Sequence, residues 1–368
     1  MNQKNSITQH QFTLLTMIFC IGSAILFIPS ILAATAMRDA WLASIVGTLL
    51  GLGLIWFYTK LYASLKGQTL VQMYDSIFGK WMGKFFTLQF AIYLIFLSSL
   101  ILRGIGDFLS TQIMNETPME ILIIILILVV VHGNNYGIQT MARSIEVFMP
   151  TLIILYIIAL ILVTKEAKLI KLLPIMENGI KPIINGSFSL FNFPFTEVVI
   201  MLMFLPCVKD QNTIKKTFLI GTCLGGIALF FPVLFGIVTM GPDLLANDLY
   251  PTYTLAKKLG FKHIFERIEV IIAIIWLLSI YFKLLLCFTA LTNSIGHLFN
   301  LRDVKSLKIP IGWILFGTSV LLADNNVYFF HFNAKIWPLY ALTIGFVIPM
   351  AMLVIHKVKQ NMKKSQSY

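Results

Sequence analysis

The sequence predicts an all-α integral membrane protein with ten transmembrane helices, arranged as two inverted repeats of five. Hydrophobic residues make up 58% of the 368 residues and charged residues only 12%, which is too apolar for a soluble domain of this size. The apolar residues come in runs of about twenty, the length at which a helix spans a bilayer. The first and the sixth run are interrupted at similar depths, which indicates a repeat.

The ten expected spans are separated by short polar or turn-rich segments. In chain order they cover residues 12–36, 41–63, 82–109, 119–133, 141–163, 185–206, 217–240, 266–298, 309–323 and 336–356. The fourth and the ninth are the shortest, at roughly fifteen residues, where a straight crossing needs about twenty. Because these short spans hold matching positions in the two halves, we expect repeats over 12–163 and 185–356 within a single transmembrane domain, residues 1–368.

The distribution of Lys and Arg predicts the orientation. Five spans per repeat is an odd number, so the two halves enter the membrane from opposite sides and the repeat is inverted. Sixteen Lys and Arg residues lie in loops on the side of the N-terminus and ten on the other side. Cytoplasmic loops carry the excess of these residues. We therefore expect both termini in the cytoplasm.

The first span imitates a secretory signal peptide. Lys4 precedes the apolar run, which ends in the small residues "AATA" at 33–36. The run is longer than the core of a signal peptide and further spans follow it, so we expect it to be retained as a helix.

Two connections are expected to hold helices of their own. Residues 69–84, "TLVQMYDSIFGKWMGK", alternate apolar and polar residues at helical spacing, which is typical of a helix lying on the cytoplasmic interface. Residues 241–260 open with Gly-Pro, contain a second proline and close on glycine, which indicates one or two short external helices over the mouth of the bundle. We expect no separate soluble domain.

The first break is predicted within "GSAILFIPS", residues 22–30, at Gly22, Ser23 and Ala24. An interrupted helix frees backbone groups at bilayer depth, which is tolerated only where protein or a polar cavity surrounds them. Pro29 removes one more helical hydrogen bond, to the carbonyl of Ile25, and bends the outer half.

The second break is predicted within the sixth span, at Asn192, Phe193 and Pro194. Proline at the first position of a new half-helix, behind a capping Asn, is a common way to restart a helix. Interrupted helices at matching positions of inverted halves indicate a midplane binding site, with half-helix N-termini facing anionic groups and unwound carbonyls facing cations. The alternative is that these are ordinary Gly and Pro residues tolerated within packed membrane helices.

Two charged residues are expected at membrane depth beside the breaks. Glu197 lies in the first turn after the second break, where it is expected to face the cavity as a proton site or ligand partner, or to brace the broken segment. Lys283 lies near the centre of the eighth span. Its ammonium either replaces a coupling cation against the first break or pairs with a carboxylate such as Glu197, or it snorkels along a tilted helix. Arg103 and Asp107 are expected to form a local ion pair rather than a ligand clamp.

Three further residues are weaker candidates for lining the site. Tyr93 and Ser98 lie at the middle of the third span, and Thr289 lies on one face of the eighth. Packing is the alternative for aromatic and hydroxyl residues in such positions. Phe193 is the stronger aromatic candidate, because it flanks the break itself.

The sequence shows no catalytic or metal-binding pattern. The four cysteines have no CxxC or CxxH spacing, and the six histidines lie at ends and loops without HxxxH, GxSxG or a phosphate-binding glycine loop. No basic face interleaved with aromatic residues indicates nucleic-acid binding. We expect no enzyme, no metal and no cofactor.

Three segments resemble the spore germination permease family, the B subunits of nutrient germinant receptors in endospore-forming bacteria. They are "GSAILFIPS", "FNFPFTEVVIMLMFLP" and "FKLLLCFTALTNSIGHLFNLRD", and the similarity extends over essentially the whole chain. Thr196 stands where the family's usual Gly is expected. The matched positions are Gly22, Ser23, Phe193, Pro194, Glu197 and Thr289.

The resemblance implies both a fold and a function. The family is similar to the amino acid-polyamine-organocation transporters, which share the LeuT-like five-plus-five inverted repeat. It implies a germinant receptor subunit in the inner membrane of the spore, partnered by an A subunit and a lipoprotein C subunit. Its pocket is implied to bind a small nutrient, typically an amino acid such as alanine or asparagine, and to signal the start of germination. The alternatives are a proton-coupled amino acid permease, with Glu197 and Lys283 carrying the coupling, and a structural part of an ion-release channel.

Overall fold

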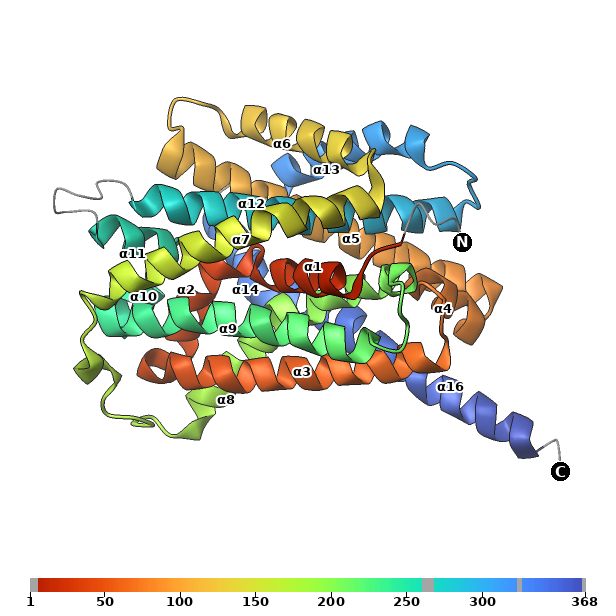
Figure 1. Ribbon diagram of the computed structural model, residues 1–368, viewed down its shortest axis with the longest axis horizontal. Coiled ribbons are helices and arrows are strands. Elements are labelled where there is room, and N and C mark those ends of the chain that lie inside the picture. The colour runs from red at the N-terminus through yellow and green to blue at the C-terminus, as the bar shows by residue number, and fades with distance from the viewer. Residues whose placement is uncertain (1–5, 260–267, 323–325, 366–368) are drawn as a thin grey trace.

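Helices make up nearly all of the chain that the computed structural model describes, which comprises residues 6–259, 268–322 and 326–365. Most of them run along one common direction and form an elongated bundle (Figure 1). Within the described residues the β-type pairing is a single bridge between Ile7 and Val208. The predicted all-α fold is confirmed.

The first five expected spans fall on the helices of the first half. These are α1 (Gln9–Ile21), α2 (Ala24–Ala36), α3 (Ala40–Ser64), α4 (Leu70–Phe78), α5 (Lys80–Phe108), α6 (Met119–Asn134) and α7 (Gly137–Thr164). Two of them, α1 and α2, form the interrupted first crossing.

The second half begins with another interrupted crossing, formed by α8 (Ile180–Leu190), the π-helical turn η5 (Phe191–Phe195) and the 3-10 helix η6 (Thr196–Met203). The helices that follow in this half are α9 (Ile214–Met240), α10 (Pro242–Ala246), α11 (Pro251–Leu259), α12 (Ile268–Leu298), α13 (Lys308–Leu321), α14 (Asn326–Lys335), α15 (Trp337–Leu342), the π-helical turn η9 (Thr343–Val347) and α16 (Ile348–Ser365).

Seven helical segments of the described chain are long and apolar enough to cross a membrane by length and composition. The count of ten spans remains a prediction. The two halves of the first crossing have 13 residues each, α6 has 16 and α13 has 14. All of these are shorter than the roughly twenty residues of a straight crossing.

A further helix, α14, precedes the last expected span. The path from α14 into α15 runs antiparallel to α5: Phe329 of α14 approaches Gly104, Trp337 stacks on Tyr93 and the hydroxyl of Tyr340 donates to the carbonyl of Gln89. The start expected at residue 336 agrees with the long apolar helical segment Trp337–Met362. "IWPLY" separates this segment from α14, because Pro338 lies at the start of α15.

Both connections contain helices, as expected, but the helix expected over 69–84 ends at Phe78, and Lys80 already begins α5. α4 begins with a capping box, in which the hydroxyl of Thr69 and the side chain of Gln72 satisfy the free backbone N–H groups. α10 and α11 pack against α2, and α11 also packs against α12, so the two short helices cover one end of the interrupted first crossing.

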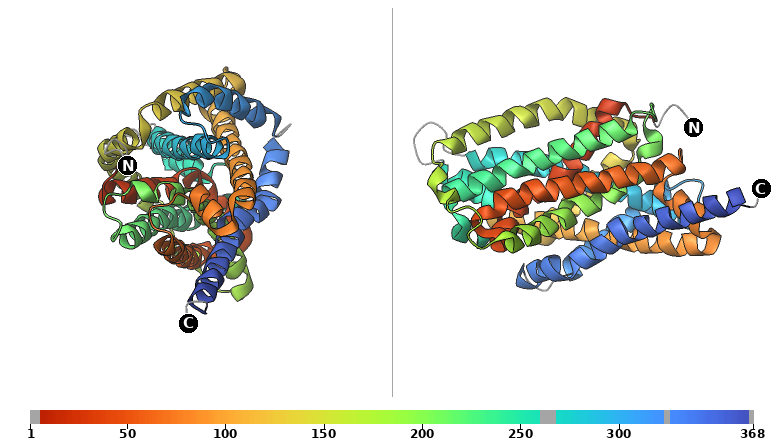
Figure 2. Two further views of the ribbon diagram at one scale, coloured as in Figure 1. Left: turned by 90° about the vertical axis from the view of Figure 1, so that its right-hand side faces the viewer. Right: turned by 90° about the horizontal axis from the view of Figure 1, so that it is seen from below.

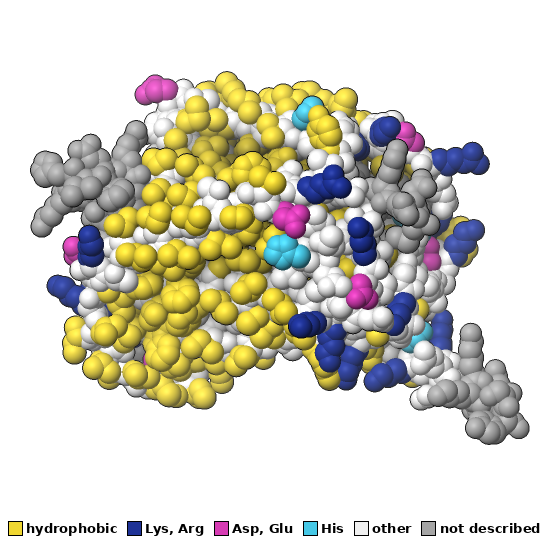
Figure 3. Space-filling model, viewed as in Figure 1, with side chains coloured by type: hydrophobic (Ala, Val, Ile, Leu, Met, Phe, Trp, Pro, Cys, Tyr) yellow, Lys and Arg dark blue, Asp and Glu magenta, His cyan; other side chains and the backbone are white. Residues whose placement is uncertain are grey.

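The surface separates apolar from basic side chains. In Figure 3 hydrophobic side chains form a broad band over the left and middle of the bundle, and Lys and Arg gather toward the right-hand end. α16 extends beyond the body of the bundle at that same end (Figures 1 and 2). Exposed leucine, isoleucine, valine and tryptophan side chains over such a band are what a lipid-facing surface requires.

A hydroxyl group replaces the helical hydrogen bond that Pro29 removes. Proline at this position leaves the carbonyl of Ile25 without its usual partner four residues on. The hydroxyl of Thr252, on α11, donates to that carbonyl at 2.7 Å. Thr252 is buried, so the bond fastens the short covering helix directly to α2.

The same replacement occurs at two other prolines. Pro232 in α9 frees the carbonyl of Ala228, which accepts from the hydroxyl of Tyr156 at 2.7 Å. The carbonyl of Gly345, four residues before Pro349, accepts from the hydroxyl of Tyr58 on α3. Each bond joins two helices that are distant in sequence. Backbone groups freed by proline inside the bundle thus become contacts between helices.

We predict that Thr252→Val lowers the free energy of unfolding by about 1 kcal/mol, because it strands the buried carbonyl of Ile25. Thr252→Ser keeps the hydroxyl and should leave stability near that of the parent protein. In a Pro29→Ala background residue 29 again donates to Ile25, so the cost of Thr252→Val should shrink. Thermal unfolding of the detergent-solubilised variants measures this, and strictly additive effects would contradict the assignment.

Candidate ligand-binding site

The first crossing is interrupted at Gly22 and Ser23, as predicted. α1 ends at Ile21, and Gly22 has φ 8° and ψ −114°, outside the helical region. The carbonyl of Gly22 accepts from the hydroxyl of Ser279 on α12 at 3.4 Å. A Cβ at position 22 would lie 2.5 Å from Cδ of Lys283, so a glycine is required here by the close approach of the lysine side chain.

The sixth crossing is interrupted at Phe193, also as predicted. Phe193 is extended, with φ −134° and ψ 111°, and the chain continues as the 3-10 helix η6 over eight residues. The predicted cap by Asn192 is wrong, since its side chain makes no capping hydrogen bond. The new half-helix starts at Thr196, beyond the reach of that side chain, and Thr196 donates to the carbonyl of Asn192 at 2.7 Å.

Two glycines allow neighbouring helices to pack closely against the second break. A Cβ on Gly51 of α3 would lie 2.5 Å from the ring of Phe195. A Cβ on Gly345 of η9 would collide with the backbone of Thr196. The start of η6 is therefore in direct contact with the last crossing, at the carbonyl that Tyr58 holds.

Lys283 and Glu197 form an ion pair between the two breaks. The Nζ of Lys283 lies 2.6 Å from Oε2 of Glu197 and donates to the hydroxyl of Ser23 at 3.0 Å. Lys283 and Glu197 have no exposed surface. Of the alternatives for Lys283, the structure contains the pairing with Glu197, and it sets the same ammonium against the first break.

Aromatic side chains enclose the pair. The ammonium of Lys283 lies 5.1 Å from the ring centroid of Phe19 and 5.2 Å from that of Phe193. The other carboxylate oxygen of Glu197, Oε1, accepts from the indole N–H of Trp337 at 3.2 Å. Trp337 in turn stacks on Tyr93, with ring centroids 5.1 Å apart and planes 8° apart. Each charge thus has an opposite charge, a neutral hydrogen-bonding partner or an aromatic face, which is what burial of an ion pair demands.

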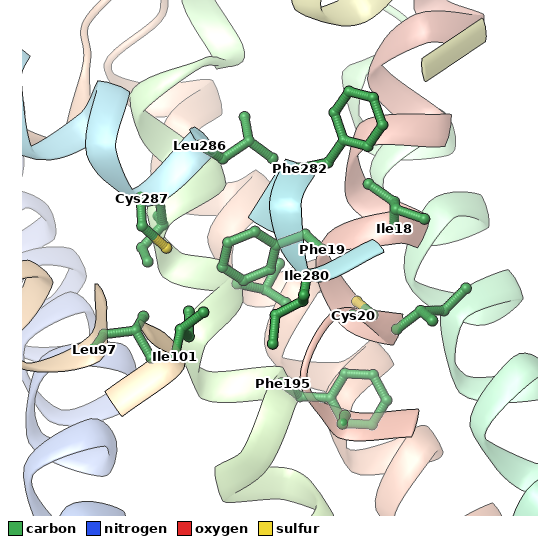
Figure 4. Close-up of a cluster of buried hydrophobic side chains, with 14 of the residues drawn as sticks. Ile18, Phe19, Cys20, Leu97, Ile101, Phe195, Ile280, Phe282, Leu286 and Cys287 are labelled. Atoms are coloured by element: carbon green, nitrogen blue, oxygen red, sulfur yellow. The ribbon is translucent and has the colours of Figure 1, made fainter. Parts of the chain in front are cut away.

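A buried apolar cluster supports this arrangement. Figure 4 shows side chains of α1, α5, α12 and the second break gathered in one cluster. Its labelled members are Ile18, Phe19, Cys20, Leu97, Ile101, Phe195, Ile280, Phe282, Leu286 and Cys287. The charged pair is therefore surrounded by low-dielectric material that strengthens its mutual attraction.

The structure brings some predicted site residues together and separates others. Gly22 and Ser23 at the first break and Phe193 and Glu197 at the second lie against Lys283, and Tyr93 reaches the pair through Trp337. Ala24 and Pro194 belong to the same two breaks, as the first residue of α2 and as part of η5. Thr289 is engaged elsewhere: its hydroxyl accepts from the amide of Asn134 at 2.7 Å and donates to the carbonyl of Leu285.

Three polar residues of α5 considered in the sequence have no hydrogen bond or ion pair with Lys283 or Glu197 in the part of the chain that the structure describes. Ser98 is buried on α5, and its hydroxyl has no hydrogen-bond partner within the described residues. The predicted local ion pair of Arg103 and Asp107 is present, with Nε and Oδ2 3.1 Å apart.

Sequence reasoning missed Trp337, Phe19 and Ser279. The expected last span starts at residue 336, so Trp337 falls at the end of that span, where aromatic residues commonly mark the membrane interface. Its position before Pro338 was the available signal, because proline interrupts a helix and exposes neighbouring groups. Phe19 and Ser279 lie within uninterrupted apolar runs, and no local pattern distinguishes them. Within the described residues no group of three His, Cys, Asp or Glu side chains is placed to hold a metal ion.

We predict that Trp337→Phe lowers the free energy of unfolding by about 1 to 2 kcal/mol, because Oε1 of buried Glu197 loses its donor while a ring remains for Tyr93. Trp41→Phe is the matched control, since the indole N–H of Trp41 has no partner among the described residues. Thermal unfolding of both variants provides the measurement. Equal losses would show that the N–H of Trp337 does not hold Glu197.

Comparison with solved structures identifies the fold. The chain is similar to Mhp1, a nucleobase-cation-symport-1 family transporter in a closed conformation with bromovinylhydantoin bound, with a TM-score of 0.67, 13% identity and coverage of 97% of this chain and 93% of that one. It is also similar to MhsT in complex with L-phenylalanine, with a TM-score of 0.65, 13% identity and coverage of 95% and 98%. These likenesses confirm the predicted transporter fold with interrupted first and sixth crossings.

Comparison of sequences identifies relatives in spore-forming bacteria. Spore germination protein KB of Bacillus subtilis is 24% identical over 96% of this chain and 95% of its own length. Spore germination protein YndE of the same species is 21% identical over 98% and 99%, and spore germination protein XB of Bacillus anthracis is 24% identical over 74% and 76%. The profile described as "Spore germination protein", of the spore permease family, matches residues 6–327. The chain therefore belongs to the spore permease family of spore germination proteins and is an integral membrane protein with a transporter fold.

Proposed function

We propose that this protein is the membrane subunit of a nutrient germinant receptor, and that it binds an amino-acid-type nutrient between its two interrupted crossings. The observation that carries the proposal is the buried pair of Lys283 and Glu197, which lies against Ser23 at one break and Phe193 at the other. A positive and a negative group at one small site suit a ligand that bears both charges. The solved complex of MhsT with L-phenylalanine supports the proposal, because that protein has the same fold.

Signalling in this proposal is a shift between two arrangements of the bundle. Lys283, Glu197 and Trp337 are buried, so a ligand reaches the pair only when the surrounding helices separate. A ligand that binds one arrangement more tightly shifts the population toward it, and no net transport is needed. The last crossing is the proposed output element, because Trp337 contacts Glu197 and Gly345 contacts Thr196.

The proposed setting is the inner membrane of the spore, with both termini on the cytoplasmic side and with A and C subunits as partners. The basic side chains at the end of the bundle where α16 projects support this orientation (Figure 3). The family membership supports the receptor role.

A proton-coupled amino acid permease is the second candidate, and one observation favours it. Glu197 and Lys283 are titratable groups buried at the proposed site, as proton coupling requires. Purified protein in liposomes separates the two functions. Concentrative, pH-driven amino acid uptake without partner subunits would support the permease, and ligand binding without uptake would support the sensor.

We predict that Gly22→Val raises the nutrient concentration for half-maximal germination by about tenfold or more, or abolishes the response, because the new side chain meets Lys283 where a Cβ alone would lie 2.5 Å away. Gly53→Val is the matched control, since a Cβ on Gly53 meets no atom within 4 Å. The measurement is the germination dose-response curve of spores with equal amounts of each variant. An unchanged curve for Gly22→Val would argue against this pocket.

A further inference from the structure

The ammonium of Lys283 occupies a site that other segments build. Its contacts are the carboxylate of Glu197 in η6 at 2.6 Å, the hydroxyl of Ser23 at the first break at 3.0 Å, and the faces of Phe19 and Phe193 at 5.1 and 5.2 Å. None of these four groups lies on α12, the helix that carries Lys283. We call this set of four groups the ammonium box.

The ammonium box has the chemistry that recognises a primary ammonium ion in general. A carboxylate supplies the opposite charge, a hydroxyl oxygen accepts a second N–H, and two aromatic faces attract the remaining charge. The side chain of Lys283 reaches the box past Gly22, where the absence of a Cβ leaves room for its methylenes. The lysine therefore relates to the box as a ligand does to its site, except that it is tethered to α12.

We propose that Lys283 is a tethered occupant of the ammonium box, and that the ligand is a zwitterion that takes over both halves of the ion pair. The ligand's ammonium replaces that of Lys283 on Glu197 and Ser23, and the ligand's anionic group pairs with the displaced lysine. The proposal deepens the proposed function and depends on it for its biological meaning. It adds a competition between the ligand's ammonium and the protein's own side chain.

The cost of an unpaired buried charge determines this selectivity. A simple amine that displaced Lys283 would leave the lysine ammonium without a partner, and a simple carboxylate would do the same to Glu197. Only a ligand with both charges leaves every charge paired. In a variant without the lysine ammonium, the ligand no longer needs an anionic group, so a simple amine should bind the ammonium box.

The first test is chemical rescue of Lys283→Ala. Purified protein is heated in detergent with methyl-, ethyl-, propyl- or butylammonium chloride, at constant chloride, and the melting temperature Tm is recorded. We expect Lys283→Ala to have a lower Tm than the parent protein and the longer alkylammonium ions to raise it again. 1-Propanol, which lacks the charge, should not. The parent protein should not respond to the amines.

Two further variants keep the test specific. The double variant Lys283→Ala with Glu197→Gln should lose the rescue, because the carboxylate of the box is gone. Lys308→Ala is the matched control: Lys308 is also buried, but its Nζ contacts the carbonyl of Asn134 and the amide oxygen of Asn135 rather than a carboxylate. Alkylammonium ions should not raise its Tm. Rescue that is absent in folded Lys283→Ala, or equal in the double variant, would overturn the proposal.

The second test uses the parent protein and does not depend on the folding of any variant. A panel of amino acids is compared with the amines and the carboxylic acids obtained by removing one charged group from each. We expect a rise of Tm with at least one amino acid and with neither of its single-charge counterparts. An equal rise with the amine alone would overturn the proposal. Both tests use purified protein, so they are independent of the germination experiment. If rescue fails but Gly22→Val weakens the germination response of spores as expected, the tethered lysine alone is rejected. If rescue succeeds but Gly22→Val leaves the germination response unchanged, the receptor role alone is rejected.

Discussion

A single ion pair of 2.6 Å joins α12 to the interrupted sixth crossing, and its lysine also donates to Ser23 at the break of the first crossing; the rest of the site is arranged around this pair. Lys283 and Glu197 are both fully buried at membrane depth, where either charge alone would cost several kcal/mol. Together they satisfy each other, and Ser23 and Trp337 take the hydrogen bonds that remain. Because the pair draws on four separate segments, it forms only when both breaks, α12 and the last crossing are in place.

The backbone obeys the same rule as the charges. Inside a bilayer a freed carbonyl has no water to bond, so the protein must supply a donor. At Pro29, Pro232 and Pro349 the freed carbonyl accepts from a hydroxyl on a distant segment. The prolines that bend these helices thereby also determine which helices are fastened together, and the covering helix α11 is attached to α2 in this way.

Close packing explains how a change at the site can reach the end of the bundle. The start of η6 lies against Gly345 without space for a side chain, and Trp337 holds the carboxylate of Glu197 from the same crossing. A displacement of Glu197 must therefore move, or be resisted by, the helices that lead to α16. That helix projects beyond the body of the bundle (Figure 2). The 3-10 helix η6 is eight residues long, whereas runs of this geometry longer than about four residues are uncommon.

Much of this architecture was determined locally and could be predicted from the sequence. Runs of apolar residues define the helices, because each span must satisfy its own backbone. Gly22-Ser23 and Phe193-Pro194 mark the breaks, because glycine is a poor helix former and proline removes a helical hydrogen bond. Glu197 and Lys283 could be predicted as site residues because charged residues are rare in such apolar runs. The partners of these groups were decided by the tertiary structure alone. The packing of helices far apart in sequence decides whether Lys283 meets Glu197, which carbonyl accepts from the hydroxyl of Thr252, and how deep Trp337 lies. No local sequence pattern specifies that packing.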